Sequence, residues 1–120
     1  MKVLVRVTKS FVRQAKPLLK KYSSLKDELS ELEIKLIENP KTGTPLGLNA
    51  HKIRLSVKSK GKGKSGGLRV ITHLGTEVIG ITLEEGETTI VTLISIYDKS
   101  ETATISDKEL KDLIAGLENE

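Results

Sequence analysis

The residues best suited to chemistry in this sequence are cations gathered in one uninterrupted block. Between Glu38 and Glu77 there is no acidic residue, yet the stretch holds eight lysines and arginines. They are Lys41, Lys52, Arg54, Lys58, Lys60, Lys62, Lys64 and Arg69. This block carries +8 and residues 77–120 carry −8, so the formal +4 of the chain hides a strong separation of charge. A merely soluble basic surface usually mixes both signs. The block therefore predicts binding of a polyanion, with phosphate the first candidate.

Three of these cations, Lys52, Arg54 and Arg69, fall in stretches that alternate like strands. Such a set suits metal-free RNA cleavage by the neighbouring 2′-hydroxyl. That reaction needs a base for the 2′-oxygen, an acid for the departing 5′-oxygen and positive charge for the phosphorane. A lysine among like charges loses its proton more readily, whereas arginine stays protonated and its fork fits phosphate oxygens. Lys99, just after the last predicted strand, could join them.

Four lysines of the Gly-Lys segment are better suited to anchoring phosphate, or to simple solvation, than to catalysis: Lys58, Lys60, Lys62 and Lys64. Tyr97 could stack on a base or close the core. The segment from Gly61 to Gly67 does not fit a P-loop, because it joins two predicted strands and has Lys58 where the motif requires its first glycine.

Composition narrows the remaining functional classes. The chain has no cysteine and two histidines, which excludes thiol chemistry and leaves little material for a metal site, so no metal or cofactor is expected. The lack of cysteine fits a reducing cytoplasm. No apolar run approaches the roughly 20 residues that span a bilayer, so no membrane is expected among the partners. The 120 residues predict one domain, 1–120.

Hydrophobic periodicity predicts both helices and strands along the chain. Residues 2–8 alternate as a strand, and two helical stripes follow, from Ser10 as N-cap to Tyr22 and from Leu25 to the stop at Asn39-Pro40. Pro17 predicts a kink or break in the first helix. Residues 40–50 are predicted as loop, and residues 51–58, 68–74, 77–83 and 89–97 as strands. Residues 75–80 fit either one long bulged strand or a separate hairpin.

A last amphipathic helix follows a capping box formed by Ser106 and Glu109. The order predicts an α+β domain, with a two-helix hairpin on a mostly antiparallel sheet and the helices on one side. The strand 89–97 is too apolar for an exposed edge, so it is placed centrally.

The sequence resembles the toxins of the RelE/ParE superfamily from bacterial toxin–antitoxin modules, closest to the RelE-like branch. The resemblance covers about residues 11–113, and its carriers are the strings 20–26, 39–46, 52–55, 66–71 and 96–101. It implies a compact RelE-like fold and an endoribonuclease that cuts mRNA in the ribosome without metal and is silenced by an antitoxin protein. It further implies that Lys52 or Arg54 acts as base, that Arg69 stabilises the phosphorane and that Lys99 assists the leaving group. The lysine-rich segment, residues 58–64, would bind ribosomal RNA.

Two other functions stay open at this point. The ParE-like branch implies the same fold in a protein that binds DNA gyrase and cleaves nothing. A non-catalytic RNA-binding module is the third interpretation, with phosphate contacts dominant because aromatic residues are scarce.

Overall fold

A five-stranded sheet forms the centre of the computed structural model, which describes residues 2–60, 67–78, 87–99 and 105–119. In chain order the elements are β1 (Lys2–Val7), α1 (Lys9–Lys21), α2 (Leu25–Glu38), β2 (Thr44–Gly47), β3 (Ala50–Leu55), the short 3₁₀ helix η1 (Lys58–Lys60), β4 (Leu68–Val78), β5 (Glu87–Asp98), α3 (Asp107–Ala115) and the 3₁₀ helix η2 (Gly116–Asn119). The strand order is β1-β5-β4-β3-β2. β1 runs parallel to β5, and the other pairs are antiparallel. The predicted α+β class and the interior place of β5 are confirmed.

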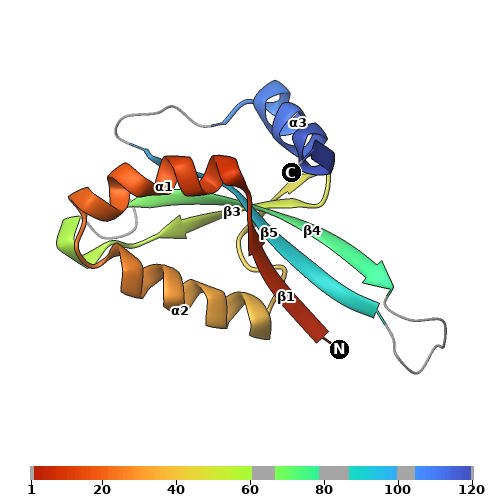
Figure 1. Ribbon diagram of the computed structural model, residues 1–120, viewed down its shortest axis with the longest axis horizontal. Coiled ribbons are helices and arrows are strands. Elements are labelled where there is room, and N and C mark those ends of the chain that lie inside the picture. The colour runs from red at the N-terminus through yellow and green to blue at the C-terminus, as the bar shows by residue number, and fades with distance from the viewer. Residues whose placement is uncertain (1, 61–66, 79–86, 100–104, 120) are drawn as a thin grey trace.

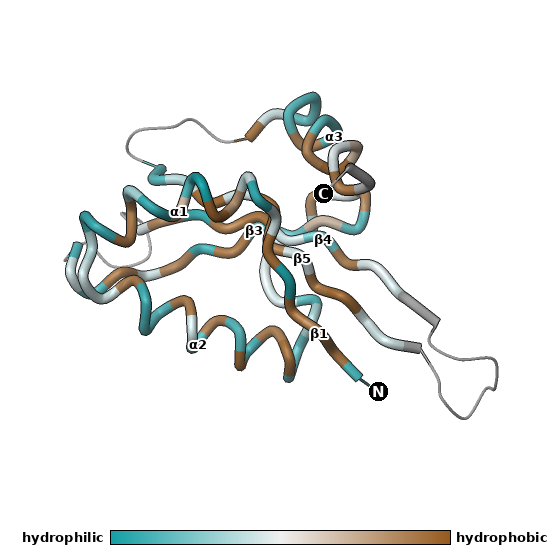
Figure 2. The backbone as a smooth tube through the Cα atoms, viewed as in Figure 1, coloured by the Kyte–Doolittle hydropathy of each residue, from teal (hydrophilic) through white to brown (hydrophobic). Residues whose placement is uncertain are grey.

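The helices cover both faces of the sheet. One core joins α1 and α2 to the face that carries Val70 and Ile96, whereas a second core joins Leu110 of α3 to Ile71 and Ile94 on the opposite face. Neighbouring strand residues point to opposite faces, so the two cores are separated by the sheet itself. In Figure 1, α3 lies apart from α1 and α2, and Figure 2 shows hydrophobic stretches along the central strands. The prediction that all helices lie on one side was wrong for α3.

The first helix begins earlier than predicted and continues through its proline. Thr8, not Ser10, is the N-cap, because its Oγ1 accepts a hydrogen bond from the Phe11 amide at 3.0 Å. α1 then runs without interruption from Lys9 to Lys21 with Pro17 inside it. The predicted break is absent because Phe11 and Ala15 anchor one side of Pro17 in the core and Leu18 packs against the same core after it.

The segment predicted as a loop before β3 contains a strand. β2 pairs with β3 through a two-residue turn in which Leu48 and Asn49 have φ angles of 57° and 61°. Two successive left-handed residues are the geometry of a type I′ hairpin turn. At the middle of the sheet, β4 continues to Val78 as one long strand, and the bulge beside Ile71/Thr72 lies in β5, where Ile94 is the extra residue. This favours the long-strand alternative, while residues 79–86 lie outside the described part.

Two predicted helix ends are confirmed. α2 ends at Glu38, directly before Asn39-Pro40. At α3 the predicted N-cap bond is formed, since the Glu109 amide donates to Ser106 Oγ at 3.1 Å, and the Glu109 carboxylate accepts a hydrogen bond from the Ser106 hydroxyl at 3.0 Å. No helix in the described ranges has the length and apolarity needed to cross a bilayer.

Candidate functional site

Three of the predicted site residues form a row across three neighbouring strands. Arg54 of β3 is paired with Arg69 of β4, and Arg69 is paired with Tyr97 of β5. Directly opposed residues share one face of a sheet, and Lys52 shares it because it lies two residues from Arg54. Tyr97 packs against the α3 core, so this is the face that α3 partly covers. The sheet thus gathers Lys52, Arg54, Arg69 and Tyr97.

The exposure of these cations differs strongly along the row. Arg54 is exposed and Lys52 is half-buried. Arg69 is only 2% exposed, and its Nη1 donates to the Leu68 carbonyl oxygen at 3.2 Å. Like charges directly opposite one another in a sheet are destabilising. The end of the row at Arg54 is therefore accessible to an anion, whereas Arg69 lies beneath the surface and does not line it.

The predicted RNA contacts divide into different environments. Lys58 is exposed at the start of η1, and Lys99 is exposed in the turn after β5. Lys60 differs from the prediction, because its Nζ lies 2.6 Å from Asp98 Oδ1 and its side chain is only 10% exposed. A lysine held in this way is not available to a phosphate without losing its partner. Lys62 and Lys64 lie outside the described residues.

Asp98 is the centre of a small buried polar network at the end of β5. Its side chain is 1% exposed, and its Oδ2 accepts a hydrogen bond from the Tyr22 hydroxyl at 2.9 Å. The Lys60 ammonium group also lies over the Tyr22 ring, 5.7 Å from its centroid. One carboxylate thus connects three elements: the C-terminal end of α1, η1 and the end of β5.

A second set of hydrogen bonds joins η1 to the start of α2. The Lys58 amide donates to Glu28 Oε2 at 2.7 Å, and the Ser24 hydroxyl donates to Glu28 Oε1 at 3.0 Å. Ser24 and Ser59 lie side by side, with their hydroxyl oxygens 2.9 Å apart. The Ser59 amide donates to Ser24 Oγ at 3.0 Å. The beginning of the lysine-rich segment is therefore fixed to the helical hairpin.

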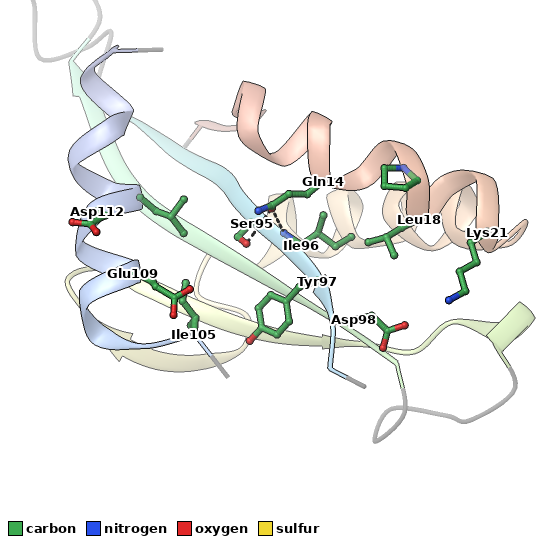
Figure 3. Close-up of a pocket in the computed structure, with 12 residues that line it drawn as sticks. Gln14, Leu18, Lys21, Ser95, Ile96, Tyr97, Asp98, Ile105, Glu109 and Asp112 are labelled. Atoms are coloured by element: carbon green, nitrogen blue, oxygen red, sulfur yellow. Dashed lines mark hydrogen bonds between the residues drawn. The ribbon is translucent and has the colours of Figure 1, made fainter. Parts of the chain in front are cut away.

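A groove of about 620 Å³ lies beside the row, between α1 and α3. Figure 3 shows Tyr97, Glu109 and Asp112 around it, with Gln14 reaching across to β5. Gln14 Oε1 accepts hydrogen bonds from Ser95 Oγ at 3.1 Å and from the Ile96 amide at 3.0 Å. These bonds occupy the edge of β5 beyond Leu93, the last residue paired with β1. The carboxylates on its wall make this groove unfavourable for phosphate, in contrast to the face at Arg54.

Two histidines occupy the sheet without joining the row. His73 shares its face but lies two strand positions beyond Ile71, and burial lowers its pKa from the usual 6.5. His51 lies on the opposite face, directly across from Thr72, where both side chains are buried. Neither histidine lies in the row formed by Arg54, Arg69 and Tyr97.

Five residues of the site region were missed by sequence reasoning: Gln14, Tyr22, Ser24, Glu28 and Asp98. In the sequence, Tyr22 marked only the end of the first helical stripe. The available signal was weak: an acid at the end of an apolar strand, and a tyrosine at the end of a helix. Their partners are 38 and 76 residues away in the sequence, so local patterns do not indicate the contacts.

Comparison with known proteins gives a fold and no close sequence relative. No family model matches the chain, and no curated protein matches it by sequence. Among solved structures, the chain matches E. coli toxin RelE, in a free-state form with two arginines replaced by alanine. The TM-score is 0.54 at 16% sequence identity, over 98% of this chain and 99% of that one. The match extends over nearly the whole of both chains, and the chain has the RelE-like fold.

Proposed function

We propose that this protein is the toxin of a toxin–antitoxin module and that it cleaves mRNA on the ribosome without a metal ion. Two findings support the proposal. The fold is that of RelE, which is a toxin in E. coli. The observation that carries the chemistry is the row Arg54–Arg69–Tyr97 with Lys52 beside it. A partly open set of cations next to an aromatic side chain suits a phosphodiester and its flanking base.

In the proposed reaction the 2′-oxygen attacks the adjacent phosphorus and the 5′-oxygen leaves, which yields a cyclic phosphate and a free 5′-hydroxyl. Lys52, in its neutral amine form, takes the proton of the 2′-hydroxyl and becomes an ammonium group, a role that arginine does not fill because it stays protonated. Arg54 contacts the phosphate oxygens, because its guanidinium is exposed. Arg69 adds positive potential from below as the dianionic phosphorane forms. Lys99, exposed after β5, donates the proton to the 5′-oxygen.

RNA binding is assigned to lysines of the cationic block and to Tyr97. Lys58, Lys62 and Lys64 contact phosphates, and Tyr97 stacks on a base next to the cleaved bond. Lys60 is left out of this set, because its ammonium group is paired with Asp98.

The proposed partners follow from the same surface. The ribosome and its mRNA present phosphate to the Arg54 side of the sheet, in the cytoplasm where translation takes place. A cognate antitoxin would inhibit the protein by covering this face with acidic residues, because carboxylates compete with phosphate for arginine and lysine.

The test is a cell-free translation reaction in which mRNA 5′ ends are mapped after addition of wild-type or variant protein. Arg54→Ala and Lys52→Gln are the informative variants, since both side chains reach solvent and their loss does not empty the core. We expect cleavage to fall by about 100-fold in each, the usual effect of removing one transition-state contact. Lys16→Gln, an exposed change on α1, is the matched control and should cleave normally.

Intact mRNA with wild-type protein would refute the nuclease. Gyrase inhibition by the same protein would then support the ParE-like alternative, and salt-sensitive RNA binding without cleavage would support the plain RNA-binding module.

A further inference from the structure

The buried carboxylate of Asp98 occupies a special position relative to the proposed site. In the sequence it lies between Tyr97 and Lys99, and across the sheet it is paired with Leu68, the neighbour of Arg69. Tyr97, Lys99 and Arg69 each have a role in the proposed reaction. Any shift of Asp98 therefore also moves residues of the row and Lys99, the proposed acid.

The contacts of Asp98 hold it from two sides. Tyr22 donates a hydrogen bond at 2.9 Å from the end of α1, and Lys60 forms an ion pair at 2.6 Å from η1. Both oxygens are used, and the side chain is 1% exposed. A buried ion pair is costly to break on one side, because the remaining charge has no water to solvate it. Contacts of this kind add little net stability, but they fix geometry.

We propose that Asp98 is a positioning residue and that Lys60 is its support, not an RNA contact. The ion pair sets η1, and with it the start of the lysine-rich segment, against the end of β5. Tyr97, Lys99 and Arg69 are then held in the arrangement that the proposed cleavage requires. This inference rests on the proposed function, and it adds a residue that acts on the reaction through its neighbours.

The alternative, in which Lys60 contacts RNA, predicts a different salt dependence of RNA binding. Lys58 and Lys60 belong to the same short helix, but Lys58 is exposed and Lys60 is 10% exposed. A lysine that contacts RNA releases a counterion on binding, so its loss reduces the salt dependence of affinity. A lysine that stays paired with Asp98 releases none.

The first experiment measures this difference with a labelled single-stranded RNA oligonucleotide over a range of salt concentrations. We expect Lys58→Met to make the slope of log K against log salt shallower by about 0.7, the contribution of one phosphate contact to a single strand. Lys60→Met should leave the slope within about 0.2 of wild type. The control, Lys16→Met at an exposed position of α1, should also leave it unchanged. A Lys60→Met slope as shallow as that of Lys58→Met would overturn the assignment.

The second experiment measures cleavage on ribosomes at saturating protein, at a temperature where circular dichroism shows every variant folded. Asp98→Asn and Lys60→Met should each lower the cleavage rate constant about tenfold with unchanged ribosome affinity. The double variant Lys60→Met/Asp98→Asn should regain stability relative to Asp98→Asn, because both charges of the Lys60–Asp98 ion pair are removed together. Its rate of cleavage should stay low, because the ion pair between Lys60 and Asp98 is still missing.

Recovery of the rate together with stability in the double variant would overturn the positioning role, as would normal cleavage by Lys60→Met. Failure of the wild-type protein to cut any mRNA is a separate result. It would refute the proposed nuclease, and the salt slopes would still decide whether Lys60 contacts RNA.

Discussion

The contact between Glu28 and the start of η1 makes a prediction that can be worked out from the structure. Glu28 is 7% exposed and accepts two hydrogen bonds, from the Lys58 amide at 2.7 Å and from the Ser24 hydroxyl at 3.0 Å. Glu28→Ala leaves the Lys58 amide without this acceptor. The Ser24 hydroxyl keeps a partner, since Ser59 Oγ lies 2.9 Å away. One charge-assisted bond is therefore lost in full and the other only in part.

The expected cost of Glu28→Ala is about 2–3 kcal/mol of unfolding free energy, since a hydrogen bond to a charged group contributes about 1.5–3 kcal/mol. For a chain of this length, that corresponds to a fall in Tm of roughly 8–12 °C. Glu28→Gln keeps an acceptor oxygen for the Lys58 amide, so it should cost only about 1 kcal/mol. Glu31→Ala removes the same charge from an exposed position of the same helix, and it should stay within about 0.5 kcal/mol of wild type.

Urea unfolding followed by circular dichroism gives these free energies, with the m-value as a check that the transition is unchanged. Amide hydrogen exchange adds a local measurement, because the Lys58 amide should exchange faster in Glu28→Ala than in Glu31→Ala. The reasoning fails if Glu28→Ala is no more costly than Glu31→Ala, or if Glu28→Gln is as costly as Glu28→Ala.

Four further predictions concern buried side chains and the N-cap of α1. Thr72→Val should be neutral or stabilising by up to about 1 kcal/mol in urea unfolding, because the Thr72 hydroxyl is fully buried with no hydrogen-bond partner in the described structure. Thr8→Val should cost about 1 kcal/mol in the same measurement, since it removes the N-cap of α1. Burial lowers the folded-state pKa of His73, so the unfolded chain takes up the proton first and stability should fall as pH drops below about 6.5; His73→Gln should flatten that part of the stability profile. Leu25→Ala should cost about 3 kcal/mol because Leu25 is 0% exposed, whereas Ile34→Ala, at 59% exposure, should cost less than about 0.5 kcal/mol by the same measurement.

Periodicity predicted most of the fold because each main element has a strong local signal. The alternation in β3 and the stripe of α2 arise from burial on one side, and the Ser106 capping box depends only on nearby residues. β2 was missed for the opposite reason. Its sequence, TPLG, contains Pro and Gly, and its hairpin turn uses Leu48 and Asn49 in left-handed conformations instead of the usual Asn-Gly. A leucine in that conformation is maintained by the pairing of β2 with β3, which no local pattern indicates.

The face of the sheet on which the site residues lie followed from the sequence, but their burial did not. Two-residue spacing puts Lys52 and Arg54 on one face, and the register then aligns Arg54 with Arg69. The low exposure of Arg69 depends on what packs around β4, which is a tertiary property. The position of α3 is another such property. An amphipathic helix shows that it has a buried side, yet either face of the sheet could receive it.

Lys58 and Lys60 show that a charge pattern in the sequence does not reveal which of its charges are exposed in the fold. In composition they are equivalent, two lysines of one basic segment separated by a serine. A 3₁₀ helix has three residues per turn, so side chains two positions apart point in different directions. In η1 this sends Lys58 to solvent and Lys60 inward to Asp98, a residue that lies outside the basic block. The +8 of the block therefore overstates the charge offered to a polyanion by at least one, and the salt dependence of RNA binding measures that difference directly.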